Sequence, residues 1–145
     1  MREIKFRGKR IDSGEWVYGN LVKCEHKDSG SAYIIPFITN GSFVINALML
    51  KFISPCYAVC PSTVGQYTSL KDRNGKEIYE GDIVYDHAER RYLEVFWNEV
   101  SAGGWWFAEN INGYMYPVGK IDLDWLEVKG NIHDNPELLE GDEEE

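Results

Sequence analysis

The sequence predicts a mainly β protein with an N-terminal β-hairpin layer (residues 1–62) packed on a small C-terminal β-barrel (residues 63–135). Fourteen glycines divide the chain into short apolar runs, which is the spacing typical of strands and turns. Aromatic residues make up 14% of the chain and suit strands better than exposed helices. Residues 65–84 contain two turn signals, Asp72-Arg73-Asn74-Gly75 and Glu80-Gly81-Asp82, which predict the opening hairpin of the barrel.

The N-terminal part is expected to be built from hairpins. We expect strands over residues 3–7, 16–22, 33–39 and 42–45, a turn over residues 11–15 and a polar loop over residues 24–31. The alternation of the first strand predicts a solvated charged face. Asn40-Gly41 is a strong two-residue hairpin signal. Residues 47–52 fit a short helix as well as a strand, and the prolines on both sides of residues 56–60 favour an edge strand there.

The C-terminal part shows the tighter spacing of a small barrel. Its expected strands cover residues 78–79, 83–85, 92–97, 105–108, 114–118 and 126–128, with a turn at residues 101–104. Asp134-Asn135-Pro136-Glu137 predicts the start of a short helical turn, because a capping residue precedes proline and an acid. Residues 136–145 are therefore expected to form this turn and a disordered acidic tail.

The chain has a net charge of −9, and its bases and acids are unevenly distributed. Residues 1–10 have five bases and one acid, whereas residues 140–145 have five acids and no base. An acidic body repels nucleic-acid phosphates, so nucleic acid is not the expected partner. The longest uncharged run, residues 29–50, is interrupted by proline, asparagine and glycine, which excludes a membrane-spanning helix. The charged start lacks a signal-peptide core, so a cytoplasmic protein is expected.

Three stretches resemble the YopX-like family of bacteriophage and prophage proteins. The central stretch runs from Thr63 to Val84 and includes Gly65-Gln66-Tyr67-Thr68 and Asn74-Gly75-Lys76-Glu77-Ile78-Tyr79-Glu80-Gly81-Asp82. Residues 1–8 and residues 127–139 also match, so the resemblance brackets nearly the whole chain. It implies a β-rich fold whose C-terminal half is an SH3-like barrel, together with phage biology in a bacterial host cell. It carries no catalytic residues over to this chain.

Two groups of residues raise the question of a metal ion. Cys24 and His26 with Cys56 and Cys60 are zinc-type ligands, but their spacing differs from the usual Cys-x-x-Cys pair, and small core thiols explain the cysteines better. Asp72 and Asn74, with two nearby glutamates, suggest calcium, but Gly75 lies at the wrong offset for a calcium loop. We therefore expect no metal and no cofactor, and interpret Asp72, Asn74, Gly75, Gly81 and Asp82 as structural turns.

No catalytic motif is present: the sequence has no nucleophile elbow, phosphate loop, dinucleotide fingerprint or His-Glu-x-x-His. His26, His87 and His133 are isolated in polar stretches, where a solvated histidine is the ordinary case. The sequence therefore predicts that the protein is not an enzyme.

The aromatic strands are the candidate binding site. On a strand, Trp105 and Phe107 face one side and Trp106 the other, so one face can be core while the other is exposed. Together with Tyr114 and Tyr116, these residues are candidates for gripping a protein partner or for packing both faces of the barrel.

The sequence thus predicts a phage or prophage accessory protein that binds a protein partner or a second copy of itself. The alternative is a nucleic-acid-binding module that uses the aromatic strands and the basic start. A small hydrolase is a third class, for which no constellation of residues is present.

Overall fold

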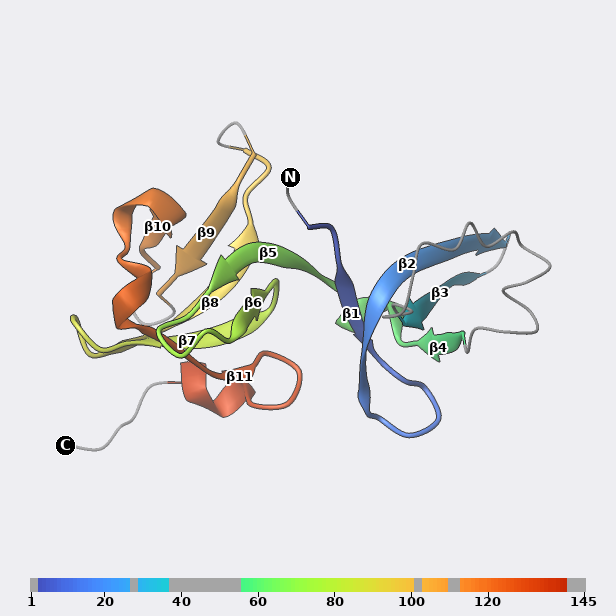
Figure 1. Ribbon diagram of the computed structural model, residues 1–145. Coiled ribbons are helices and arrows are strands. Elements are labelled where there is room, and N and C mark those ends of the chain that lie inside the picture. The colour runs from blue at the N-terminus through green and yellow to red at the C-terminus, as the bar shows by residue number, and fades with distance from the viewer. Residues whose placement is uncertain (1–2, 27–28, 37–55, 101–102, 110–112, 141–145) are drawn as a thin grey trace. The chain divides into compact units, whose positions relative to one another are not determined.

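The structure is a computed structural model that describes residues 3–26, 29–36, 56–100, 103–109 and 113–140, and the side chains of these residues except 24–26, 29 and 30 (Figure 1). The chain divides into two compact units, Met1–Gln66 and Tyr67–Glu145. Both are built from antiparallel strands with short 3₁₀ helices, so the predicted mainly β fold is confirmed. Within the described part of the chain, no helix has the length and hydropathy that crossing a bilayer requires.

The first unit is a strongly paired antiparallel sheet. Its strands are β1 (Phe6–Lys9), β2 (Trp16–His26), β3 (Ser29–Pro36) and β4 (Tyr57–Val59), in the order β4-β3-β2-β1. The outer side of β4 is also bonded, because the N–H of Ile11 donates to the carbonyl of Ala58 (3.1 Å) and that of Cys60 to the carbonyl of Lys9 (2.8 Å). The sheet therefore returns to its first strand around a small core of Ala32, Ile34 and Val59, with Phe6, Val17, Leu21 and Val64 packed against it.

Two predictions for this unit were wrong. The first strand begins at Phe6, and Arg7 is buried instead of lying on a solvated charged face. Its guanidinium lies 4.7 Å from the centroid of the Trp16 ring, a cation–π contact that favours the charge beside an aromatic side chain. The predicted loop at residues 24–31 is instead the end of a long hairpin, because β2 continues to His26 and β3 begins at Ser29. The predicted hairpin at Asn40-Gly41 and the element at residues 47–52 lie outside the described residues.

The second unit contains a five-stranded sheet in the order β10-β9-β8-β7-β11. These strands are β7 (Asp82–Asp86), β8 (Arg91–Trp97), β9 (Trp105–Ala108), β10 (Met115–Pro117) and β11 (Leu126–Asn131). β5 (Gly65–Lys71) begins in the first unit, where Gly65 and Gln66 pair with β1, and its later residues pair with β6 (Glu77–Tyr79). The predicted strands of the C-terminal part are thus present in the predicted order.

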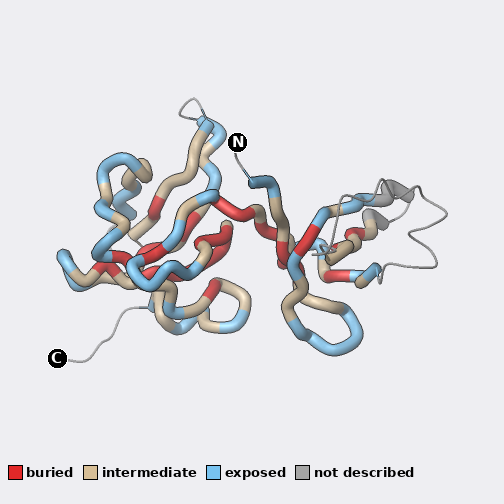
Figure 2. Tube along the Cα trace, in the orientation of Figure 1, coloured by how far each residue is buried: buried red, intermediate tan, exposed pale blue. Residues whose placement is uncertain are grey.

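One face of the five-stranded sheet forms the core of the second unit. Figure 2 colours the buried residues of these strands red. Fully buried side chains from four strands of this sheet and from β6 meet there: Ile78, Val84, Leu93, Val95, Phe107 and Leu126. We call this the inner face. The 3₁₀ helices η2 (Val118–Lys120) and η3 (Leu123–Trp125) contribute half-buried apolar side chains to it. Residues 136–139 form the predicted helical turn as the 3₁₀ helix η4 (Pro136–Leu139), which packs against β8, and the tail at residues 141–145 lies outside the described residues.

Candidate functional site

The turn residues Asp72, Asn74 and Gly75 hold the β5–β6 hairpin to the rest of the second unit. The Asp72 carboxylate is buried and accepts the backbone N–H groups of Asn74 (2.8 Å) and Lys76 (2.9 Å) on one oxygen. Its other oxygen accepts the N–H of Val128 on β11 (2.9 Å). Gly75 has a φ of +79°, which a side chain with a Cβ rarely adopts. These oxygens are therefore committed to backbone donors.

Gly81 and Asp82 form a second structural turn between β6 and β7. Asp82 is almost fully buried, and its carboxylate accepts the N–H of Tyr79 (2.7 Å). Gly81 has a φ of +88°; its N–H donates to the carbonyl of Val95, and its carbonyl accepts the N–H of Ile132, both at 2.9 Å. The turn thus joins three segments of the barrel through its backbone.

Three of the predicted aromatic residues lie on the inner face. Phe107 is opposite Val95 on β8 and has no exposed surface. Trp105 packs against the same core, and its ring meets that of Trp97 edge-on with 5.0 Å between the centroids. Tyr116 lies opposite Phe107 on β10 and is half-buried against the core. These rings contribute to packing, and Phe107 leaves no surface for a partner.

A network of charged groups surrounds Tyr116. Arg91 donates a hydrogen bond of 3.2 Å to the carboxylate of Asp86 and another of 3.2 Å to that of Glu109. Its guanidinium lies 4.4 Å from the centroid of the Tyr116 ring. The Tyr116 hydroxyl donates to Glu109 (3.2 Å). The arginine thus has a carboxylate on two sides and an aromatic ring on a third, and its charge is fully compensated.

The opposite side of the same sheet, which we call the outer face, includes Trp106. Strand register places Phe96, Trp106 and Pro117 in one row, and Glu94, Ala108 and Met115 in the next. A third row contains Tyr85 and Tyr92, whose rings are 4.9 Å apart. These side chains keep part of their surface exposed, and Met115 exposes 55% of its own, whereas Ile83, opposite Glu94 in the same row, is fully buried. The outer face is therefore a partly exposed aromatic surface with one carboxylate in its middle row.

Strand β10 is an edge strand of this sheet, and Met115 on it and Tyr114 just before it expose 55% and 62% of their surfaces. The N–H of Glu109 donates to the carbonyl of Tyr114 (2.8 Å), so by alternation the backbone groups of Met115 face away from β9. Pro117 has no N–H to offer on that side. A partner would therefore contact β10 mainly through its side chains and less through backbone hydrogen bonds.

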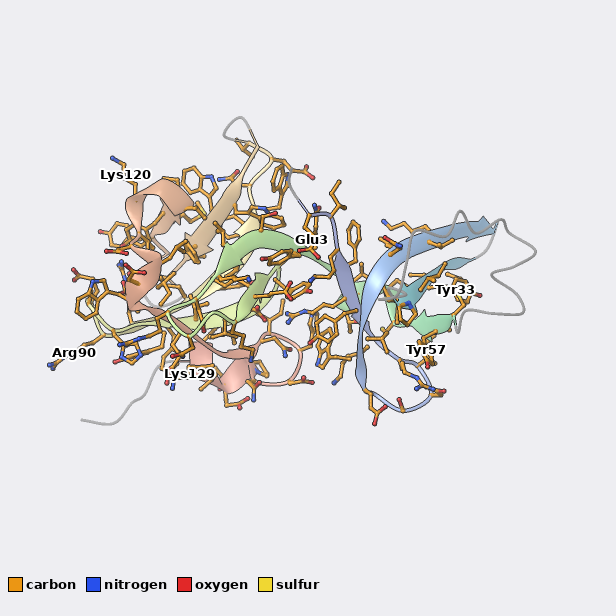
Figure 3. The ribbon with its side chains drawn as sticks, viewed as in Figure 1. Glu3, Tyr33, Tyr57, Arg90, Lys120 and Lys129 are labelled. Carbon is orange, nitrogen blue, oxygen red and sulfur yellow. The ribbon has the colours of Figure 1, made fainter. Side chains whose placement is uncertain are left out.

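His87 belongs to a cluster at the β11 side of the outer face. Its Nε2 is 3.7 Å from a carboxylate oxygen of Glu127, and its ring meets Tyr85 edge-on at 4.8 Å. A hydrogen bond from Lys129, a residue labelled in Figure 3, lowers the pKa of the Glu127 carboxyl. The histidine is half-buried, so the expectation of a solvated side chain was wrong at this position.

The residues considered as metal ligands do not come together within the described part of the chain. No three His, Cys, Asp or Glu side chains there are placed to share an ion. Cys56 is exposed, and the half-buried Cys60 lies 3.3 Å from the Ser62 hydroxyl. The side chains of Cys24 and His26 lie outside the described set.

Sequence reasoning missed Tyr92, Glu94 and Phe96 as neighbours of Trp106. Alternation along β8 could have placed them on one face, opposite Leu93 and Val95. It could not have shown that this face adjoins Trp106, because the pairing of β8 with β9 depends on the register across the intervening turn.

Comparison with known proteins gives a family but no activity. The model of the family described as YopX protein matches residues 5–140. A solved structure, described as protein EF1440 from Enterococcus faecalis, is 25% identical and superposes with a TM-score of 0.52, covering 96% of this chain and 99% of that one. No curated protein matches the chain. Because the family model covers almost the whole length, this chain belongs to the YopX protein family.

Proposed function

We propose that this YopX family member is a non-enzymatic accessory protein of a bacteriophage or prophage that acts in the cytoplasm of the host bacterium. It binds a protein partner through the outer face and the adjoining strand β10. The observation that carries the proposal is the partly exposed row of Phe96, Trp106 and Pro117 beside the exposed Met115. Large aromatic and methionine side chains at a surface are typical of protein interfaces.

Charge supports a protein partner over a nucleic acid. The second unit has seven Lys and Arg against nineteen Asp and Glu, a net charge of −12. The first unit has eight bases against five acids, a net charge of +3, and several of these bases are engaged within it. Arg10, for example, bonds to Asp12 and lies over the Tyr57 ring. The aromatic surface therefore lies on the unit that repels phosphates most strongly.

The non-enzymatic role is supported by how the buried polar groups are used. The carboxylates of Asp72 and Asp82 accept backbone N–H groups, and that of Asp86 accepts Arg91 and the N–H groups of Ala88 and Glu89. Groups committed in this way stabilise turns and cannot readily exchange protons with a substrate.

A capture experiment tests the proposal. The tagged full-length protein is recovered from host cells with an induced phage or prophage, and the proteins that accompany it are quantified by mass spectrometry. Met115→Lys introduces a positive charge on the exposed side of the interface and is expected to lower capture of the partner at least about tenfold, since a buried unpaired charge is costly.

The matched control is Val100→Lys, which adds the same charge at a residue 94% exposed and outside the outer face. Capture should be unaffected in this variant. Equal capture by the wild type and both variants would contradict a binding role for this face. Capture that disappears after nuclease treatment would favour the nucleic-acid-binding alternative, and recovery of a second copy alone would identify self-association.

A further inference from the structure

Glu94 lies at the centre of the outer face, surrounded by apolar and aromatic side chains. Its neighbours directly across the sheet are Ile83 on β7 and Ala108 on β9. Tyr92 and Phe96 flank it two residues away on its own strand, and Trp106 lies on the diagonal. Directly opposed residues have Cβ atoms about 5 Å apart, and diagonal ones are within reach of a large ring. The carboxylate thus projects into a surface made mostly of rings.

No cation of the described residues accompanies the Glu94 carboxylate. Among the described residues, no hydrogen bond or ion pair reaches Glu94, and burial raises the pKa of its carboxyl. The other half-buried acids of the sheet are paired: Glu109 with Arg91, and Glu127 with Lys129. Glu94 is therefore an acid held in a partly desolvated setting without the partner that its neighbours have.

Elsewhere in this chain, a carboxylate beside an aromatic ring is accompanied by an arginine. Arg91 lies over the Tyr116 ring while bonding to two carboxylates, and Arg10 lies over the Tyr57 ring while bonding to Asp12. In both places an arginine contacts the face of an aromatic ring and a carboxylate at the same time. Among the residues that the structure describes, the surroundings of Glu94 supply the ring and the carboxylate but no cation.

We propose that Glu94 and the rings of Tyr92, Phe96 and Trp106 bind a lysine or arginine side chain in a basic segment of the protein partner. This inference rests on the proposed function and specifies its chemistry. The ammonium or guanidinium group pairs with the Glu94 carboxylate, while the aliphatic part of the side chain or the face of the guanidinium packs on the rings.

The charge around the outer face favours such a partner. The second unit has a net charge of −12, and η4, which packs against β8, has the exposed acid Glu137 in its first turn and the exposed acid Glu140 just after its end. Lys129, the base beside Tyr85 and Tyr92, is already bonded to Glu127. A basic segment is therefore steered to this unit by charge and meets one unpaired carboxylate there.

Short peptides test the inference directly. The probes are acetyl-Gly-Ser-Arg-Ser-Gly-amide, its lysine analogue and its norleucine analogue, each titrated into the full-length protein. Binding is followed by the NMR shift of the Trp106 indole N–H, assigned with Trp106→Phe. We expect millimolar binding of the arginine and lysine peptides and at least about tenfold weaker binding of the norleucine peptide, because the latter lacks the charge-assisted bond.

Glu94→Gln is the test variant, and Glu99→Gln, which removes the same charge from an exposed residue, is its control. Glu94→Gln should lower the affinity for the arginine peptide about tenfold, whereas Glu99→Gln should change this affinity less than about twofold. Equal weakening by both variants, or equal binding of the norleucine peptide, would overturn the inference. Thermal melts of both variants verify that the fold is kept.

The capture experiment separates this inference from the proposed function. If Met115→Lys loses the partner and Glu94→Gln retains it at wild-type levels, the outer face is an interface but the cation contact is refuted. If neither variant changes capture, both the function and the inference are contradicted. Loss of the partner in Glu94→Gln together with retention in Glu99→Gln supports both.

Discussion

At the scale of single residues, neighbouring positions on one strand have opposite roles. Trp105 and Phe107 pack on the inner face, whereas Trp106 between them lies on the outer face. The same alternation on β8 places Leu93 and Val95 in the core and Glu94 between aromatic rings. The period of two residues in a strand thus assigns packing and binding to adjacent side chains.

Truncating the two tryptophans should therefore have different consequences. Trp105→Ala removes a ring that packs on the core and on Trp97, and is expected to cost about 3 kcal/mol or more of unfolding free energy. Trp106→Ala removes a half-buried ring from the outer face and should cost about 1–2 kcal/mol while abolishing partner capture. Urea denaturation followed by circular dichroism, beside the capture experiment, measures both effects. A larger loss of stability for Trp106→Ala would show that the faces are misassigned.

Glu94 should make stability depend on pH in a specific direction. Burial raises the pKa of its carboxyl above the ordinary value of 4.5, so the folded state holds this proton more tightly than the unfolded chain does. The protonated group is free of the desolvation penalty below about pH 4, and the penalty appears as the pH rises through the raised pKa.

Glu94→Gln should consequently melt at a higher temperature than the wild type at pH 7, and this difference should vanish near pH 4. Melting curves of both proteins between these pH values measure it, with Glu99→Gln as a control that shows no such trend. A Glu94→Gln protein that melts lower at pH 7 would mean that the carboxylate is stabilised by a partner in the fold.

At the scale of elements, the turns around β6 set the shape of the second unit. The Asp72–Gly75 turn bonds to β11, and the turn at Gly81 bonds to β8 and to the segment after β11. Both turns need a residue with positive φ, and both were recognisable in the sequence from their Asn-Gly and Gly-Asp pairs.

Valine at either glycine should destabilise the protein through the backbone. A Cβ on Gly75 would meet no atom within 4 Å, and one on Gly81 would make only ordinary contacts, so the cost comes from φ and not from a clash. We expect Gly75→Val and Gly81→Val each to cost roughly 1–3 kcal/mol. Gly119→Val is the control, because its backbone lies outside the positive-φ region and its Cβ would also meet nothing. Thermal melts that do not distinguish the three variants would refute the proposed role of the turns.

At the scale of the whole molecule, charge and aromatic surface differ between the two units. The first unit has a net charge of +3 and closes its sheet through backbone bonds between β4 and residues 9–11. The second has a net charge of −12 and carries the aromatic outer face. The overall charge of −9 conceals this division, which is visible only once the boundary at residue 66 is known.

Local chemistry determined much of what could be predicted from this sequence. The strands of the C-terminal part and the turns at Gly75 and Gly81 follow from alternation and from glycine or asparagine at defined positions, because these signals act between neighbours in the chain. The family, too, could be recognised from the motif between Thr63 and Val84.

Only the tertiary structure decided which side chains meet across strands. The burial of Arg7 beside Trp16, the extension of the β2–β3 hairpin to His26 and Ser29, and the placement of Glu94 beside Trp106 all depend on register between separate segments. A polar or charged residue in isolation predicts a solvated loop or face, since burying it alone costs free energy. The pairing of backbones and the contact of a cation with a ring offset that cost, and neither is encoded in the spacing of residues along one strand.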